Sequence, residues 1–561
     1  MLIAVSGCGG AEERADAGAD AAARDAGPPD AGPFMPDLEC PGGPGCTAGG
    51  DGMLFAGAAA VAITPTVDDT TEVLTLDVNG NGSYDPEEGD TFRDTNGNGA
   101  LDGIWIAGFG NGRAATGVND DQWARALVLR DGDITLAIVA VDAVGLFYDD
   151  VLLVREALSD LDVDYVTLAA THSHQAKDTM GIWGRTYFET GLDHAYQETI
   201  RAASVRAVRE AVAGLERVNV QYASLRLRDV PGGVLRYVGD NRDPQILDDE
   251  ARVMRFVRAG ADTTVATLTN FAAHPEYAGS ENTLLSSDYV HWLRAGIEDG
   301  VTGADGARRD GVGGIAVFVN GALGCQIGPN GIDPRRWDGT PPDRGLDRAH
   351  TIGEQLAWHV LGALGPDGGS TTDETAVLGV RTRTLFLDVQ NRKYHFAAVG
   401  ELFERRTYHW DETRPLLPGR NEPDVMTEIA VIDVGRAQFL TAPGEMDPAL
   451  FVGGYDGAYT PEGVMIVDPD NPNPPDLSRA PPPPYLRDRM RADAEMRGVF
   501  GLTSDQLGYL IPSFNYELAS PGAYFDEAAG DHYDETNSLG PDAWPNLERE
   551  LNALLAWPAE P

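Results

Sequence analysis

The chain has 561 residues, and its 88 acidic and 42 basic side chains give a formal net charge of −46. Such a charge argues against nucleic acid as a partner, because the phosphate backbone would be repelled. No apolar run approaches the roughly 18 residues that a membrane span requires, so we expect no transmembrane helix. The length suits one large α/β domain with insertions.

The first residues are similar to the end of a bacterial lipoprotein signal, with small residues before Cys8, which would carry the lipid. A charged region and most of the apolar region of such a signal are lacking, so Cys8 could instead be an ordinary cysteine. Residues 1–52 are predicted to be a truncated signal followed by a disordered tether rich in Ala, Asp, Gly and Pro. We expect an extracytoplasmic protein, lipid-anchored to the bacterial envelope or secreted, that touches a membrane only through this lipid.

Three further cysteines fall into two groups. Cys40 and Cys46 flank a Pro-Gly-Gly-Pro-Gly run and could close a small disulfide loop in an oxidising compartment. Cys325 stands alone in an apolar context and is predicted to be buried.

An insert at 77–103 carries the D-x-N-x-N-G-x-x-D-x-x-E order of a calcium loop. The predicted oxygen ligands are Asp77, Asn79, Asn81, Ser83, Asp85 and Glu88. A partial second loop without a closing Glu follows at Asp94, Asn96, Asn98 and Asp102. Residues 72–76 read as a strand, so we predict a calcium loop without an EF-hand helix pair. The alternative is a cluster of Gly and Asn turns without metal.

Strands and helices alternate after the insert, which predicts an α/β domain over residues 53–561. The expected strands are 54–64, 124–130, 133–142, 164–170, 218–227, 253–257, 263–273, 314–320, 377–387, 428–434 and 437–442. The expected helices are 148–161, 196–215, 289–297, 346–364 and 543–555. Residues 365–374 are predicted to be a linker and the Pro-rich residues 469–484 an extended surface loop.

Metal-binding residue types follow several of these strands. The strand at 164–170 runs into Thr171-His172-Ser173-His174, and the strand at 263–273 runs into His274. The strand at 437–442 is followed by Glu445, and Tyr509 lies in the short apolar run 507–511. Ligands of open α/β sheets gather at the carboxyl ends of strands. Two imidazoles one residue apart could hold a metal or divide acid–base work, or they could only make surface hydrogen bonds.

Several stretches, in matching order, resemble the catalytic domain of the neutral/alkaline (non-lysosomal) ceramidases. They are 107–110, 122–126, Asp142, 171–174, 241–244, 270–275, 443–445, 508–509 and 532–534. The resemblance implies a layered αββα-type α/β fold with mixed sheets and loop inserts. It also implies a zinc amidase that removes the acyl group from a lipid-like substrate.

Carried over residue by residue, the resemblance makes His172, His274, Glu445 and Tyr509 the zinc ligands. It places His174, Arg242 and Tyr533 around the scissile carbonyl, where they would stabilise the oxyanion or pass a proton to the leaving amine. Imidazole nitrogens, a carboxylate and a phenolate are acceptable zinc ligands, and a catalytic site leaves one position open for water.

The chain departs from the family pattern at two places. Gly328 stands where the family has a serine that is important for activity, and His174 is followed by Gln175-Ala176-Lys177 instead of Ser-Gly-Pro. No G-x-S-x-G elbow and no H-E-x-x-H motif is present, so neither a serine hydrolase of the α/β type nor an ordinary zincin is supported. The expected function is zinc-dependent hydrolysis of an N-acyl amide in a lipid-like substrate. The alternative is a non-catalytic, calcium-dependent cell-surface binding protein.

Overall fold

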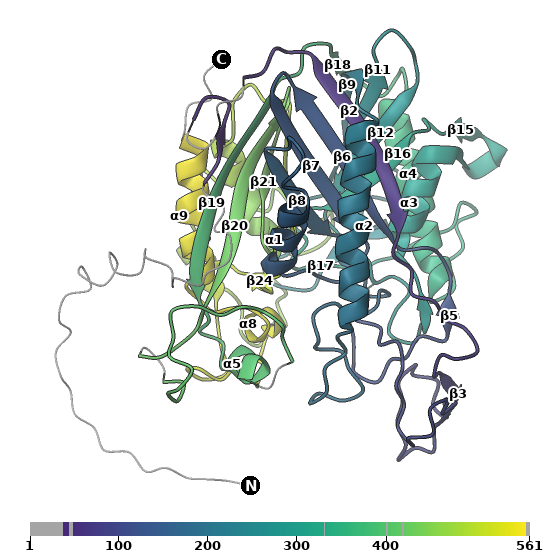
Figure 1. The fold of residues 1–561 in the computed structure, drawn as a ribbon, viewed down its shortest axis with the longest axis vertical. Helices are drawn as coiled ribbons and strands as arrows, with labels where there is room; N and C mark the ends of the chain where they lie inside the picture. The colour runs from purple at the N-terminus through teal and green to yellow at the C-terminus, as the bar shows by residue number, and fades with distance from the viewer. Residues whose placement is uncertain are drawn as a thin grey trace, which may run out of the picture.

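The structure is a computed structural model that describes residues 37–43, 46, 49–329, 331–399, 402–417 and 420–556. Two β-sheets pack face to face, and helices cover the outer face of each sheet (Figure 1). The predicted four-layer α/β fold with mixed sheets is therefore confirmed.

The larger sheet has nine strands and places both histidine segments at the ends of parallel neighbours. Its strands are, in spatial order, β16 (Ile315–Asn320), β12 (Thr264–Phe271), β11 (Glu250–Arg258), β9 (Glu216–Arg226), β2 (Leu54–Ala62), β6 (Trp123–Asp131), β7 (Ile134–Val141) and β8 (Tyr165–Ala170), with β18 (Thr371–Asp373) on β9. The pairs β7–β8 and β12–β16 are parallel, and the other neighbours are antiparallel. Because β18 lies within the predicted linker 365–374, that prediction is wrong there: the segment pairs with β9.

The smaller sheet has five strands and follows the second half of the chain. Its spatial order is β1 (Glu39–Cys40), β19 (Leu378–Asp388), β20 (Asp424–Val434), β21 (Ala437–Thr441) and β23 (Met496–Phe500). Only β21 and β23 pair in parallel.

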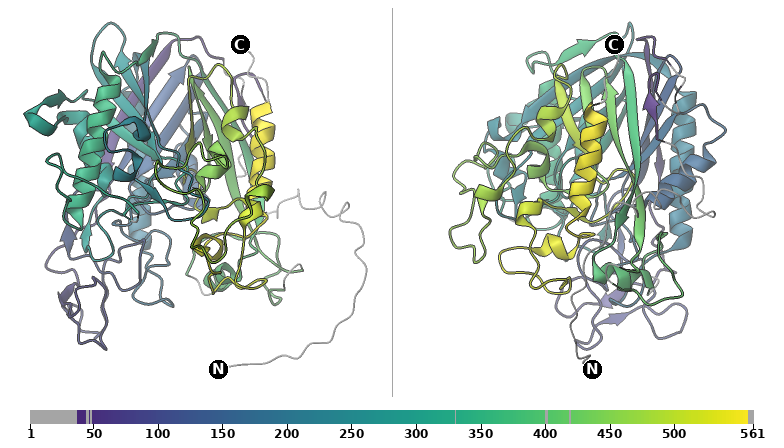
Figure 2. Two further views of the ribbon diagram at one scale, coloured as in Figure 1. Left: turned by 180° about the vertical axis from the view of Figure 1, so that it is seen from behind. Right: turned by 90° about the vertical axis from the view of Figure 1, so that its left-hand side faces the viewer.

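The alternation of side chains along the strands explains the layers. In β7, Leu136 and Ile138 point into the core between the sheets, whereas Ala137 and Val139 pack under the outer helices. Both faces of the strand are buried, which is why its sequence reads as a continuous apolar run. The outer helices are α1 (Tyr148–Ala157), α2 (His194–Ala213), α3 (Tyr289–Asp299) and α4 (Leu346–Leu364) on the larger sheet and α9 (Ala543–Ala556) on the smaller one (Figure 2).

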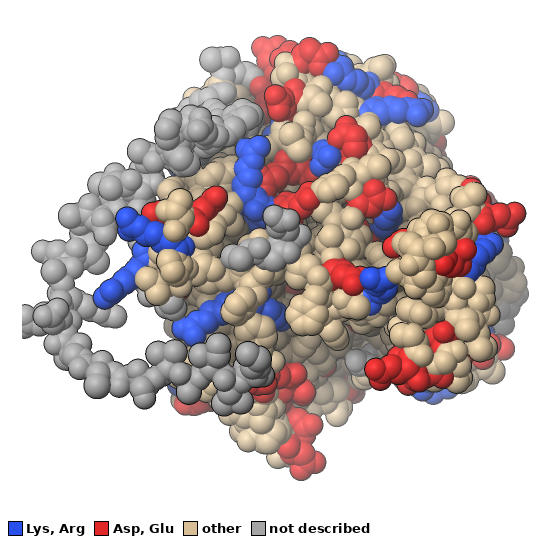
Figure 3. Space-filling model, turned by 60° about the horizontal axis from the view of Figure 1, so that its bottom comes forward, with Lys and Arg blue, Asp and Glu red and all other residues tan. Residues whose placement is uncertain are grey.

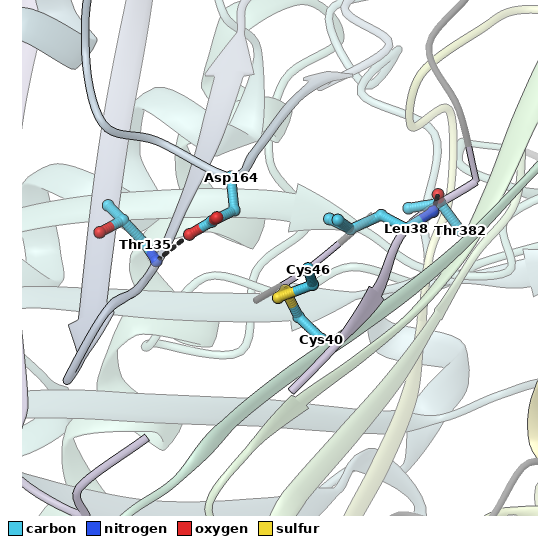
Figure 4. The surroundings of a disulfide bond; sticks show 6 residues. All are labelled: Leu38, Cys40, Cys46, Thr135, Asp164 and Thr382. Atoms are coloured by element: carbon cyan, nitrogen blue, oxygen red, sulfur yellow. Dashed lines mark hydrogen bonds between the residues drawn. A yellow bond between two sulfur atoms is a disulfide. The ribbon is translucent and has the colours of Figure 1, made fainter. Parts of the chain in front are cut away.

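The folded part begins before residue 53, so the predicted tether 1–52 is too long. β1 pairs with β19, and Cys40 and Cys46 form the expected disulfide (Figure 4). Leu38 N–H donates to Thr382 Oγ1 at 2.8 Å. These backbone pairs, the burial of both cysteines in the inter-sheet core and the packing of Leu38 against that core hold the segment in place. Cys8 and the rest of residues 1–36 lie outside the described residues.

Long loops and several of the short elements lie at the lower end of the molecule in Figure 1, whereas the strand at Arg308–Asp310 lies at its upper right. The paired strands are β3 (Leu74–Leu76) with β4 (Thr91–Phe92), β5 (Gly117–Val118) with β13 (Leu284–Leu285), β10 (Gly239–Asp240) with β17 (Gln326–Ile327), β14 (Gly300–Thr302) with β15 (Arg308–Asp310), and β22 (Glu445–Met446) with β24 (Tyr509–Leu510). The short helices are α5 (Arg392–Val399), α6 (Pro448–Val452), α7 (Leu486–Arg489) and α8 (Tyr533–Thr536). The Pro-rich loop 469–484 contains one short helical turn, Leu477–Arg479. Within the described residues, no helix is long and apolar enough to span a membrane.

Candidate metal centre

The two predicted histidine segments meet because one buried amide joins the strand ends that carry them. Asn320, the last residue of β16, donates from Nδ2 to Thr171 O at 3.1 Å and to Ala273 O at 2.9 Å. These carbonyls directly precede His172 and His274. Sequence analysis missed Asn320, although its place at the end of a buried strand is the signal that would have found it.

Backbone carbonyls fix the orientation of the His172 and His274 rings. Their Nδ1 atoms lie 2.5 Å from Val144 O and 3.1 Å from Gln326 O. A ring nitrogen that faces a carbonyl carries the proton, so we assign the Nε2 lone pair as free on both rings. His172 also has a φ of 70°, a left-handed conformation that is unusual for a non-glycine residue and is typical of functional sites.

Both free nitrogens face one oxygen of Glu445. Its Oε2 atom lies 3.0 Å from His274 Nε2 and 3.4 Å from His172 Nε2. Its Oε1 atom accepts a hydrogen bond of 2.7 Å from Gln506 Nε2, a partner that the sequence did not indicate. The parallel pairing of β22 and β24 sets Tyr509 directly opposite Glu445. The structure therefore brings three of the four predicted zinc ligands into contact and places the fourth on the adjacent strand.

His174 belongs to the same cluster. His172, His174 and His274 each offer a nitrogen within 4.8 Å of the others, and His174 Nε2 lies 3.3 Å from His172 Nε2. On its other side, His174 Nδ1 lies 3.2 Å from Glu276 Oε2. Sequence analysis missed Glu276, even though it follows His274 by two residues.

Burial and neighbouring charges separate the protonation states of these groups. Burial lowers the pKa of His174 to about 4 although Glu276 opposes the shift, so its imidazole is neutral at pH 7. Burial would also lower the pKa of His274, but Glu445 and Glu276 raise it overall. Burial would raise the pKa of Glu445, yet His172 and His274 hold it well below its usual range. Glu445 is therefore an ionised carboxylate at neutral pH.

Two tyrosines lie together beside the centre, Tyr509 in β24 and Tyr533 in α8. The ring centroids of Tyr509 and Tyr533 lie 6.0 Å apart. Burial, followed by the charge of Glu445, raises the pKa of Tyr509 well above its usual value. Tyr533 is 52% exposed, which places it at the outer edge of the centre.

Arg242 lies against α8, and its charge is paired with a carboxylate of that helix. It binds Glu535 through both terminal nitrogens, at 2.8 and 2.7 Å, and donates to Asn515 O at 2.6 Å. Within the part of the chain that the structure describes, no hydrogen bond or ion pair links Arg242 to His172, His174 or His274. The guanidinium is neutralised by the helix that carries Tyr533, and its contact with the scissile carbonyl stays a prediction. Cys325, buried beside Asp534 as predicted, belongs to this network.

The position of the missing family serine is filled by another side chain. A Cβ atom built on Gly328 would lie 2.4 Å from the ring of Tyr277. Tyr277 is fully buried, and its hydroxyl donates to Tyr237 O. A residue larger than glycine at 328 therefore requires the Tyr277 ring to move.

The predicted calcium loop is a compact turn on the surface. Asp77 accepts hydrogen bonds from Gly80 N and Gly82 N at 2.7 and 2.8 Å, and the Asn79 amide donates to Glu88. The second and last predicted ligands, Asn79 and Glu88, are thus in contact, and the first, Asp77, faces backbone N–H groups of the same loop. Calcium binding there stays a prediction.

The partial second loop has the same construction. Asp94 accepts from Gly97 N and Gly99 N at 2.6 and 2.9 Å, and Asn96 and Asn98 both donate to Asp102. Glu72, from before the first loop, accepts from Asp102 N at 2.8 Å. The carboxylate of Glu72 therefore closes the loop, because the local sequence has no Glu at the closing position.

Comparisons with known proteins bear on the fold. No protein-family model and no curated protein matches the chain. A neutral ceramidase from Pseudomonas aeruginosa is similar in structure, with 15% sequence identity, a TM-score of 0.54 and coverage of 90% of this chain and 74% of that chain. A ceramidase complexed with C2 has 16% identity, a TM-score of 0.56 and coverage of 90% and 75%. The chain therefore has the fold of the neutral ceramidases.

Proposed function

We propose that the chain is a zinc-dependent hydrolase that cleaves an amide (N-acyl) bond in a lipid-like substrate. The observation that carries the proposal is the approach of His172 Nε2 and His274 Nε2 to one oxygen of Glu445, at 3.4 and 3.0 Å, with both Nδ1 atoms facing backbone carbonyls. The ceramidase fold supports it.

The donor set fits zinc. Two imidazoles with free Nε2 lone pairs, an ionised carboxylate and an adjacent phenol are borderline-soft and hard donors of the kind that zinc accepts. His172, His274, Glu445 and Tyr509 would hold the ion. Zinc would activate a water molecule for attack and polarise the amide carbonyl.

The remaining residues of the centre handle the proton and the developing charge. Gln506 orients Glu445 through the hydrogen bond to Oε1. His174, which is neutral and backed by Glu276, is placed to take up a proton and pass it to the leaving amine. The Tyr533 hydroxyl is a donor for the oxyanion that forms on the carbonyl. Arg242 acts indirectly, because its pairing with Glu535 fixes the helix of Tyr533.

Aromatic side chains beside the centre support an apolar substrate. The Phe109 ring packs edge-on against His174 with centroids 5.2 Å apart, and the Trp183 indole donates to Phe109 O. The same loop continues into Tyr187 and Phe188, which are 77% and 90% exposed. The lower end of the molecule shows uncharged surface between scattered charges (Figure 3). Exposed apolar residues of this kind are typical of surfaces that meet apolar ligands.

Calcium binding at the 77–88 loop and a location outside the cytoplasm are part of the proposal. The spacing of the oxygen-bearing residues along the loop and the contact between Asn79 and Glu88 support calcium. The Cys40–Cys46 disulfide supports an oxidising compartment. Attachment through a lipid on Cys8 is proposed on the sequence alone.

Elemental analysis of the dialysed protein, combined with an assay on N-dodecanoyl amides, tests the proposal. We expect one zinc per chain and release of dodecanoate, and loss of both in His172→Ala. His359→Ala is the matched control, since this histidine lies in α4 and contacts Tyr237, away from the centre. Bound calcium without zinc or hydrolysis would favour the calcium-dependent binding protein instead.

A further inference from the structure

The chain has only two lysines among its 42 basic side chains, and both lie near the metal centre in sequence or in space. Lys177 follows His174 by three residues, and its Nζ atom is paired with Asp193 Oδ2 at 2.5 Å. It also lies 5.0 Å from the centroid of the Tyr196 ring. The charge of Lys177 is therefore already neutralised inside the protein.

Lys393 differs from Lys177 because no carboxylate of the described residues pairs with it. Its Nζ atom donates to Asn537 Oδ1 at 2.7 Å, an uncharged partner. The side chain is half-buried in the first turn of α5. Burial lowers the pKa of Lys393 to about 8, so the ammonium keeps its proton at pH 7. The protein has a net charge of −46, yet this ammonium is partly removed from water without a carboxylate partner among the described residues. Burying an unpaired charge is unfavourable, and an anionic ligand would offset that penalty.

Three contacts place Lys393 beside the ligand strand β24. Asn537, its partner, accepts a hydrogen bond from Tyr509 N at 3.0 Å through its main-chain oxygen. The Asn537 amide also donates to Tyr533 O at 3.1 Å. The next residue of α5, Tyr394, has its hydroxyl 2.8 Å from a Cβ atom built on Gly508. The start of α5 therefore packs directly against the strand and the helix that carry the two tyrosines of the centre.

We propose that the substrate of this centre carries an anionic group near the scissile amide, and that Lys393 binds this group at the rim. The inference rests on the proposed function and adds the substrate class: an N-acyl amino acid, whose carboxylate lies two bonds from the amide nitrogen. The Asn537 side chain links the ammonium to Tyr533 O, and the hydroxyl of the half-exposed Tyr533 is a further donor for polar groups on the substrate. The acyl chain would lie along the aromatic side chains Phe109 and Trp183.

The test compares two ligands that differ in charge. Binding of N-dodecanoylglycine and of the uncharged N-dodecanoylethanolamine is measured by calorimetry on the zinc-loaded protein. We expect tighter binding of the anion, and a loss of roughly tenfold in its affinity in Lys393→Met, as for a hydrogen bond to a charged group. Affinity for the uncharged ligand should change by less than about twofold on the same ground, because it makes no ion pair.

Two further variants separate charge recognition from a structural role. Lys393→Arg keeps the charge and should keep most of the preference for the anion. Arg392→Met removes an exposed charge one residue away, beside Gly522, and should leave both affinities unchanged. Equal affinities of the two ligands for the unaltered protein, or a parallel loss of both in Lys393→Met, would overturn the inference. Release of dodecanoate from both ligands is measured separately and tests the proposed hydrolysis, and its heat is subtracted so that the calorimetric signal reports binding alone.

Discussion

The metal centre and the 77–103 insert both gather metal-binding side chains, but the protein holds them in opposite ways. In the centre, His172, His274 and Glu445 are each more than a hundred residues apart along the chain, and all three are buried. In the insert, the predicted ligands are consecutive along the chain and mostly exposed. The first region depends on the packing of both sheets, whereas the second depends on its own backbone.

This difference decides how far a disturbance spreads. When a buried polar group loses its hydrogen-bond partner, its desolvation is no longer offset, and the free energy of unfolding falls. The effect reaches the neighbouring strands, because they belong to the same hydrogen-bond network. An exposed loop that loses a hydrogen bond exchanges it for water and opens locally. We therefore expect changes at the centre to alter metal binding and global stability, and changes in the insert to stay there.

The largest effect is expected for Asn320→Ala, which removes the amide that joins the two histidine strands. Thr171 O and Ala273 O would lose their donor, and zinc affinity should fall by roughly tenfold or more, as for other residues that orient metal ligands. Competition with a chromogenic chelator measures the affinity. Gln355→Ala is the matched control, because this buried amide lies in α4 and donates to Arg335 O, away from the histidines. Equal zinc affinities of the two variants would contradict the role of Asn320.

A smaller effect is expected for Gly328→Ser, which restores the family serine. The new Cβ atom would overlap the Tyr277 ring, so the free energy of unfolding should fall by about 1–3 kcal/mol, the usual cost of overpacking. Urea unfolding measures this, and Gly328→Ser combined with Tyr277→Ala should lose less than the sum of the single changes. Strict additivity of the two changes would show that the residues do not compete for the space.

In the insert, Asp77→Ala should abolish calcium binding to the first loop and leave the centre intact. Asp77 holds Gly80 N and Gly82 N, so hydrogen exchange should speed up over the loop alone. Zinc content and hydrolysis should stay within about twofold of the unaltered protein, because the opening is local. Asp69→Ala, an exposed aspartate outside the loop, serves as the control. Loss of zinc from Asp77→Ala would show that the two regions are coupled.

The smallest effect is expected when the pH is lowered and the Glu72 carboxylate takes up a proton. Burial would raise its pKa, but the N–H groups of Asp102 and Thr95 lower it below its usual value. The ionised carboxylate therefore stabilises the second loop above about pH 4.5, its ordinary pKa, and this contribution is lost as pH falls through the lower folded value. Exchange protection of residues 94–102 should fall on acidification in the unaltered protein. In Glu72→Gln it should already be low at pH 7; equal protection in both proteins would contradict the role of Glu72.

Much of the fold could be predicted from local sequence patterns. The helix predicted at 346–364 has those bounds, and the buried run at 133–142 forms β7, because periodicity is a property of consecutive residues. The calcium-loop spacing is equally local. The strands β1 and β18 were missed because they are only two and three residues long, too short for a periodic pattern, and are held by pairing with β19 and β9.

The centre shows what the sequence alone determined and what only the tertiary structure decided. The resemblance to the ceramidases selected His172, His274 and Glu445, and their positions at predicted strand ends agreed with it, because ligands gather where strands stop. The packing of distant strands decided the rest of the geometry. It brings both Nε2 atoms to one oxygen of Glu445, anchors both rings on backbone carbonyls and lets Asn320 join the two histidine segments. The same packing turned Arg242 toward Glu535 and filled the serine position with Tyr277. Contacts between residues far apart in the chain depend on which surfaces the folded sheets bring together, and no local pattern encodes that choice.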